Sequence, residues 1–276
     1  MEQKEIRFRK QRDLGQVMSD SFDFLRQEYK AILRMIGIYV LPFLVLYAGV
    51  QVYLQKNVLV NIDLSDPEAM MANIKPLESN LFIFLLFGLF VQSLLVGTYY
   101  SYLEAYIKFG KGNFQLSDIS SRFFSNSLMA LGAGLIFTFT SLFGVMLCFL
   151  PGIYIANTLS LMFFTVIFEK QGIGNAAGKS WKLVNTQWWN TLALNILGLI
   201  LWYAVGLIFS IPSIIIGLTG GLNAALTKTP VEYPQWYWVL AGITSIVSTI
   251  ALIIPYTFQA FQYFNREVQE NPGSEN

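Results

Sequence analysis

Residues 127–168 form an almost uninterrupted apolar stretch, and this stretch limits the folds that the chain can adopt. As an α-helix it would be about 60 Å long, whereas the hydrocarbon core of a bilayer is about 30 Å thick. The stretch is therefore long enough for two membrane crossings. Leu150-Pro151-Gly152 is expected to separate them, because proline removes a backbone donor and glycine permits a turn.

Four further apolar stretches are long enough to cross the hydrocarbon core as helices, and the composition agrees with a membrane location. The chain is 54% hydrophobic and 13% charged, whereas a typical soluble domain has about 25% charged residues. The excess of apolar side chains requires a solvent such as lipid. We predict an all-α, polytopic membrane protein with six transmembrane helices, at about 31–54, 81–107, 127–149, 152–168, 191–217 and 236–261.

Positive charge is distributed unevenly between the two sides of this arrangement, in which an even number of spans places both termini together. Of the eighteen Lys and Arg residues, Lys56, Lys75 and Lys228 fall on the opposite side, which leaves fifteen on the side of the termini. Lys and Arg are enriched in cytoplasmic loops, so we predict cytoplasmic N- and C-termini in the cell (inner) membrane. The predicted domains are a cytoplasmic N-terminal segment with an amphipathic helix at 1–30, a membrane domain at 31–262 and a disordered cytoplasmic tail at 263–276.

A row of mostly apolar side chains recurs ahead of pairs of predicted spans. The first copy comprises Leu14, Val17, Met18, Ser21, Phe22, Leu25 and Tyr29. The second copy has the same spacing and comprises Ile173, Ala176, Ala177, Ser180, Trp181, Val184 and Trp188. A weaker third copy comprises Leu116, Ile119, Phe123, Phe124 and Leu131. The spacing is typical of one face of a helix and predicts three cytoplasmic amphipathic helices.

These amphipathic helices would either lie in the membrane interface or pack on the cytoplasmic ends of the spans. Each of them, followed by a helical hairpin, would form one unit of a threefold repeat about an axis along the membrane normal. The alternative is that any cytoplasmic linker before a span tends to be amphipathic, without a repeat.

Two carboxylates, Glu104 and Glu169, lie at the ends of the second and fourth predicted spans. Carboxylates inside a membrane often mark proton or ion pathways. These two lie near the predicted cytoplasmic boundary, so a structural clamp is the other interpretation. Glu104 is expected to pair with Lys108 one helical turn later. Glu169 is expected to reach the N-terminal end of the 173–188 helix or Lys179.

Asn157 is one of four polar amide side chains inside the predicted spans, and such groups need hydrogen-bond partners in hydrocarbon. The other three are Gln92, Asn195 and Gln259. They either join helices or line a cavity. A row of small residues in the second span offers the same two interpretations, close helix packing or a substrate path. This row comprises Ser93, Gly97, Ser101 and Ala105.

The residues needed for the common catalytic and metal chemistries are missing. The chain has no histidine and one cysteine, Cys148, so the commonest general base and metal ligand are absent. No phosphate-binding loop, serine elbow or paired-cysteine motif occurs. We predict no catalytic, cofactor-binding or metal-binding residues and no enzymatic activity. A net charge of +1 gives no indication of nucleic-acid binding.

One part of the chain resembles a known family. The residues concerned are Phe168-Glu169-Lys170-Gln171-Gly172-Ile173, Ala176-Ala177, Lys179-Ser180-Trp181-Lys182-Leu183 and Trp188-Trp189. This pattern resembles the membrane domain of the glycerophosphoryl diester phosphodiesterase family and its uncharacterised bacterial relatives. The resemblance implies a multi-pass bacterial membrane protein. The family's activity belongs to a separate soluble domain that needs histidine, so it is not carried over to this chain.

The sequence favours a scaffold, regulatory or envelope-associated membrane domain without enzymatic activity. A transporter or permease for a small solute or lipid is the alternative, and the discriminating feature is whether the polar side chains meet in a cavity. The expected partners are the lipid bilayer, a membrane or cytoplasmic protein, and a second copy of the chain. The polar positions proposed for structural or functional roles are Glu104, Asn157, Glu169, Lys179, Ser180 and Trp181.

Overall fold

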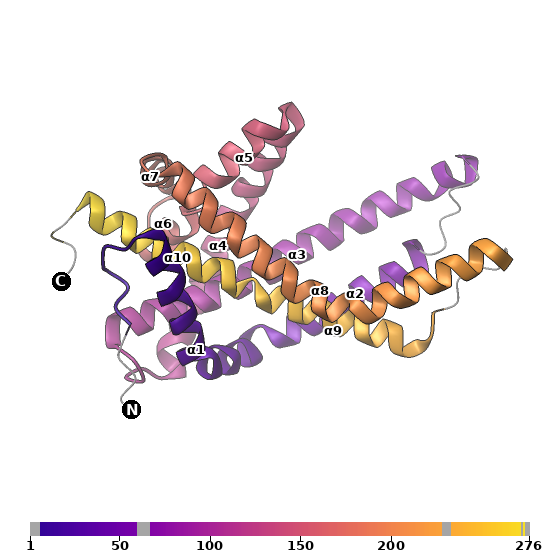
Figure 1. Cartoon of the computed structure of the whole chain (residues 1–276), viewed down its shortest axis with the longest axis horizontal. Coiled ribbons are helices and arrows are strands. Elements are labelled where there is room, and N and C mark those ends of the chain that lie inside the picture. Colours follow the sequence, from indigo (N-terminus) through magenta and orange to yellow (C-terminus); the bar gives the residue numbers. More distant parts are fainter. Residues whose placement is uncertain (1–5, 60–66, 228–232, 272, 274–276) are drawn as a thin grey trace. The chain divides into compact units, whose positions relative to one another are not determined.

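The computed structural model describes residues 6–59, 67–227, 233–271 and 273, and these residues form helices without any β-strand. The elements are α1 (Leu14–Tyr39), α2 (Leu41–Leu54), a π-helical turn (Gln55–Leu59), α3 (Pro67–Phe109), α4 (Leu116–Leu147), α5 (Phe149–Thr158), α6 (Met162–Phe168), α7 (Ile173–Asn185), α8 (Trp188–Thr227), α9 (Gln235–Ala251) and α10 (Ile253–Glu270). Figure 1 shows this helical order. The protein is therefore all-helical in its described part, as the sequence predicts.

Five helical segments of the described residues are long and apolar enough to cross a membrane, or six if the bent pair α1–α2 counts as one span. The five segments are Leu81–Phe109, Leu116–Leu147, Phe149–Phe168, Trp188–Asn223 and Gln235–Glu270. Each overlaps one of the predicted spans. The apolar helices therefore support a helical membrane protein, and the remaining candidate span begins in the amphipathic helix α1.

Two predicted spans are interrupted where proline removes a donor. Pro42 cannot donate to the carbonyl of Ile38, and α1 ends at Tyr39. Pro255 cannot donate to the carbonyl of Ala251, the residue at which α9 ends. The predicted spans at 31–54 and 236–261 therefore each comprise two helices, although Gln235–Glu270 still counts as one candidate span. A third predicted span, 152–168, is divided between α5 and α6.

The hairpin between α4 and α5 turns at Cys148, just before the predicted separation at Leu150-Pro151-Gly152. Pro151 lies in the first turn of α5, where a missing backbone donor costs nothing because that turn has no intrahelical partner. A Cβ on Gly152 would lie 2.8 Å from the backbone nitrogen of Val145. Glycine therefore permits the two helices of the hairpin to pack closely.

The chain divides into two compact units, and each is built from separated stretches of sequence. Unit 1 comprises Met1–Val40, Gln92–Leu201 and Leu252–Asn276. Unit 2 comprises Leu41–Val91 and Trp202–Ala251. Helices α3 and α8 contribute residues to both units.

Helix α10 is largely buried inside unit 1. It packs against α1 and α7, and Figure 1 shows the first and last helices side by side. Its side chains are buried from Pro255 through Phe264 and on to Val268 with few interruptions. The predicted disordered tail at 263–276 is therefore wrong for residues 263–270, which complete this helix. Residues 272 and 274–276 of that tail lie outside the described residues.

The three amphipathic helices form and pack against the rest of unit 1. On α1, Val17, Ser21 and Phe24 are fully buried. On α7, Ala176 lies in a buried cluster with Ala133 of α4 and Met162 of α6. One side of each helix therefore packs on the bundle, which is one of the two arrangements that the sequence left open.

Unit 2 is formed largely by α2, α9 and parts of α3 and α8. Helix α2 packs against α9, where Ser245 donates a hydrogen bond to the side chain of Gln51. The ring of Tyr47 stacks on Phe84, with centroids 4.7 Å apart. The indole of Trp202 donates to the carbonyl of Ser248 at 2.7 Å. Small and aromatic side chains thus join the helices of this unit.

Candidate functional site

Glu169 lies at the centre of a polar cluster where three helices of unit 1 meet. It is the residue after α6, and Lys179 of α7 and Tyr263 of α10 both donate to its Oε1 atom. The side-chain amide of Gln171 donates to its Oε2 atom at 2.9 Å. The sequence predicted Lys179 as a partner of Glu169, and the structure has this ion pair. The contribution of Tyr263 was missed, because residue 263 was assigned to a disordered tail.

Glu104 forms a second cluster in unit 1, with partners from two other elements. Arg122 of α4 donates to its Oε1 atom at 2.6 Å, and the ammonium of Lys170 lies 3.8 Å from its Oε2 atom. The predicted pair with Lys108 is wrong, because Lys108 instead lies over the ring of Phe109, 5.2 Å from its centroid. Long-range packing of α4 brings a stronger donor to Glu104 than the neighbouring helical turn offers.

Asn126 connects the Glu104 cluster to the loop after α6. Its side-chain amide donates to Ser101 Oγ at 2.8 Å, and its Oδ1 atom accepts from Lys170 Nζ at 2.6 Å. Lys170 also has a left-handed backbone, with a φ of 54°, which is uncommon outside glycine. The two clusters are adjacent in sequence through Glu169 and Lys170, so one short loop joins helices α3, α4, α7 and α10.

Lys170 is expected to titrate at lower pH than an ordinary lysine, since burial and the neighbouring Arg122 lower its pKa, while Glu104 opposes the shift. The folded state disfavours the charged amine, so Lys170 costs stability below its lowered pKa. That cost decreases as the pH rises from the folded pKa toward the ordinary value. We expect the NMR signal of ¹³C-dimethylated Lys170 to titrate at a lower pH than that of a dimethylated lysine in a short unstructured peptide. The signal of Lys170 is assigned by its loss in the variant Lys170→Arg. Titration of Lys170 at the same pH as the peptide lysine would contradict this prediction.

A chain of three amides crosses unit 1 from α5 to α10. Gln259 donates to Asn195 Oδ1 at 3.1 Å, and Asn195 donates to Asn157 Oδ1 at 2.8 Å. Asn157 in turn donates to the backbone carbonyl of Trp188 at 3.1 Å. These side chains satisfy one another inside apolar helices, where an unpaired amide would be costly.

Ser180 and Trp181 are neighbours on α7 but have different surroundings. Ser180 is fully buried and its Oγ donates to the carbonyl of Thr158 at 2.7 Å. Trp181 is exposed and meets Tyr154 edge-on, with ring centroids 5.5 Å apart. The first residue therefore joins α7 to the end of α5, and the second faces outward.

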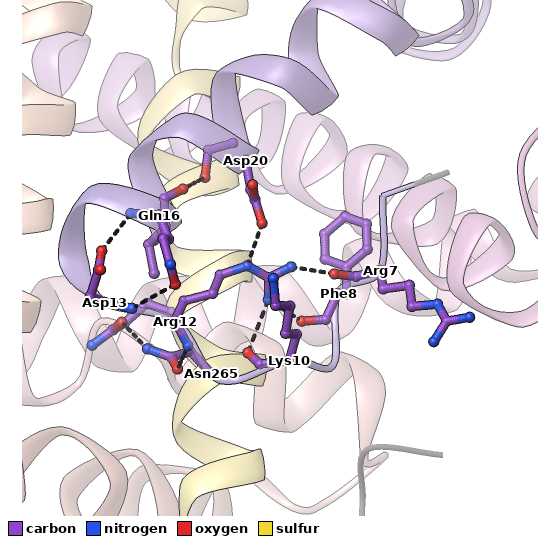
Figure 2. Close-up of polar contacts among 11 residues, drawn as sticks. Arg7, Phe8, Lys10, Arg12, Asp13, Gln16, Asp20 and Asn265 are labelled. Carbon is purple, nitrogen blue, oxygen red and sulfur yellow. Dashed lines mark hydrogen bonds and ion pairs between the residues drawn. The ribbon is translucent and has the colours of Figure 1, made fainter. Parts of the chain in front are cut away.

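The N-terminal arm, residues 6–13, adds a polar centre that the sequence did not indicate. Figure 2 shows the guanidinium of Arg12 turned back onto the arm. It donates to Asp20 Oδ2 at 2.7 Å, to the carbonyl of Phe8 at 2.6 Å and to that of Lys10 at 3.1 Å. It also donates to the carbonyl of Arg7. Arg12 is only 6% exposed, although the arm reads as polar sequence of mixed charge.

The arm is held at both of its ends. The ring of Phe8 stacks on Phe261 of α10, with centroids 4.4 Å apart. At the other end, the backbone N–H of Arg12 donates to Asn265 Oδ1 at 2.8 Å. Asp13 then caps α1 by accepting from the N–H of Gln16 at 2.8 Å, which satisfies a free donor of the first turn. Arm, α1 and α10 therefore form one packed region.

Comparison of the chain with protein-family models, with curated proteins and with solved structures gives no match. In the part of the chain that the structure describes, no group of three or more Cys, Asp or Glu residues is placed to hold a metal ion. The clusters around Glu104, Glu169 and Arg12 consist of acids paired with bases and of donors paired with acceptors. Such arrangements hold helices together.

Proposed function

We propose that this chain is a non-enzymatic integral membrane protein that acts as a scaffold or regulatory domain. The observation that carries the proposal is the use of its polar groups. Glu104 pairs with Arg122, Glu169 pairs with Lys179, and Asn157 is bonded to Asn195. Side chains engaged in helix contacts are not free to bind a solute, whereas a packed bundle can hold partner proteins in a membrane.

The test is photocrosslinking of the full-length chain in native membranes. A photoreactive residue at Trp181, which is exposed on α7, should form a discrete, stoichiometric adduct with a partner protein or a second copy. The control position is Ile208 on α8, an exposed apolar residue that should label lipid. A monomeric protein with no protein adduct from either position, and none recovered in mild detergent, would contradict the proposal.

The proposed topology has six spans, with both termini in the cytoplasm of a bacterial cell. The first span, at about 31–54, comprises the end of α1 and all of α2. Fifteen of eighteen basic residues then lie on the cytoplasmic side. The family resemblance stays a prediction. A threefold repeat is supported by burial, because Val17, Ile119 and Ala176 occupy the same position of the three amphipathic helices and are all buried.

Cys148 provides a direct check of this topology, because it is the sole cysteine and is exposed at the turn between α4 and α5. We expect a membrane-impermeant maleimide to label it from outside intact cells. In the background Cys148→Ser, the substitution Asn113→Cys in the loop before α4 should be labelled only after the membrane is opened. The reverse pattern would place the termini outside.

Transport of a small solute or lipid is the second candidate, and interrupted helices favour it. Helix α5 ends at Thr158, one residue after Asn157, and α6 begins at Met162. Broken helices beside polar side chains form substrate sites in many transporters. Asn195→Leu would then abolish uptake into vesicles while the exposed-surface variant Ile208→Ala retained it. Uptake that never exceeds that of empty vesicles, over a broad solute panel, would count against transport.

A further inference from the structure

Helix α1 has two apolar sides, and only one of them is covered. Val17 and Phe24 on the inner side are fully buried. Phe22, Tyr29 and Leu33 form a second row and are 43%, 49% and 45% exposed. The ring of Phe22 meets that of Phe258 edge-on, at a centroid distance of 5.5 Å. One half of the apolar surface of this helix therefore packs against the bundle, and the other half is exposed.

Three basic side chains accompany the exposed row. Arg26, Lys30 and Arg34 are all exposed and follow one another at intervals of one helical turn. None of the three forms an ion pair with a residue that the structure describes. The ammonium of Lys30 lies 5.9 Å from the ring centroid of Tyr29. Asp23 borders the row, so the face keeps a net positive charge.

Exposed aromatic rings beside basic groups without an ion pair are typical of a surface that contacts the membrane interface. At the boundary of a membrane, aromatic side chains enter the upper acyl region, while Lys and Arg extend to the phosphate groups. The chain holds α1 close to lipid, because α2 begins at Leu41 directly after it and is apolar. Equivalent positions on α4 and α7, Phe124 and Trp181, are also exposed aromatic residues.

We propose that the exposed row of α1, with Arg26, Lys30 and Arg34, binds the anionic headgroups of membrane lipids. The lipid phosphates lie between the basic side chains, and Phe22, Tyr29 and Leu33 enter the interface beneath them. This assignment goes beyond a scaffold role, because it specifies lipid charge as a factor that holds the N-terminal helix in place. It needs the membrane location of the chain but no protein partner.

The experiment measures lipid selectivity of the full chain in nanodiscs of phosphatidylcholine. Spin-labelled phosphatidylglycerol is compared with spin-labelled phosphatidylcholine for association with the protein. The triple variant Arg26→Gln, Lys30→Gln, Arg34→Gln should lower the relative affinity for phosphatidylglycerol at least about tenfold. A charge-matched variant, Lys10→Gln, Lys56→Gln, Lys108→Gln, changes three exposed lysines elsewhere and should leave most of the selectivity.

Two outcomes would overturn the proposal. Equal losses in both triple variants would show that net charge alone attracts the lipid. Unchanged selectivity in the α1 variant would show that this face does not bind anionic lipid and faces another partner, such as an acidic protein. Should the α1 variant fold poorly, the wild-type protein still gives a test. Raising NaCl from about 0.05 M to about 0.5 M should remove its selectivity by screening, and selectivity that resists salt would contradict a charge-based contact.

Discussion

Replacing Gly97 by alanine is expected to destabilise the protein by about 3 kcal/mol, which corresponds to a melting temperature about 5–10 °C lower. A Cβ at this position would lie 2.5 Å from both the backbone nitrogen and the Cα of Ser127. Backbone atoms of α4 cannot turn aside as a flexible side chain does, so α3 and α4 must separate. The measurement is thermal unfolding of the purified protein in detergent.

The matched control is Gly37→Ala on α1, where no heavy atom lies within 4 Å of the added Cβ. Alanine is a better helix former than glycine by roughly 0.5–1 kcal/mol. The control should therefore melt at the same temperature or slightly higher. If both variants melted alike, the close approach of α3 and α4 at Gly97 would be wrong, together with the packing interpretation of the small-residue row.

Replacing Arg12 by alanine is the second change with a large expected effect, about 3 kcal/mol of lost stability. The substitution removes the partner of Asp20 and the donors that serve three backbone carbonyls of the arm. The arm should then detach from α10. Chymotrypsin cleavage after Phe8 is the measurement, because the ring of Phe8 is 3% exposed in the folded protein and becomes accessible when the arm is released.

Arg12→Lys should restore little of this protection. One ammonium cannot reproduce the planar, multiple-donor geometry with which the guanidinium serves Asp20 and the carbonyls. Arg7→Ala is the control, since the exposed Arg7 side chain extends away from the cluster in Figure 2. Cleavage at equal rates in Arg12→Ala and Arg7→Ala would show that Arg12 does not hold the arm.

The helices that can cross a membrane were predictable because the requirement of lipid is local. A stretch must be apolar over its own length, whatever it later packs against. The sequence indicates that Pro42 and Pro255 each kink or end a helix, but not which of the two occurs at each position. Whether a proline only bends a helix or ends it depends on the neighbouring helices that pack against it. The residues of one span do not show that packing.

The polar clusters were predictable only where partners are close in sequence. Glu169 and Lys179 were paired correctly because they flank one short connection. Glu104 was paired wrongly, since Arg122 comes from another helix and outcompetes the neighbouring turn. The end of α10 was missed for a related reason. Asn265 reads as part of a polar tail, yet it is buried and accepts a hydrogen bond from the backbone N–H of Arg12.

The contact between the N-terminal arm and α10 sets the order in which this protein can mature. The ribosome delivers Phe8 about 250 residues before Phe261, so the stacking partner of the Phe8 ring does not exist while the intervening helices are synthesised. Unit 1 therefore closes only after α10 has been synthesised. Until then the nascent protein carries an unfinished surface that chaperones or proteases can recognise. A frameshift before the codon for Phe261 would consequently leave the arm at residues 6–13 without its partners on α10.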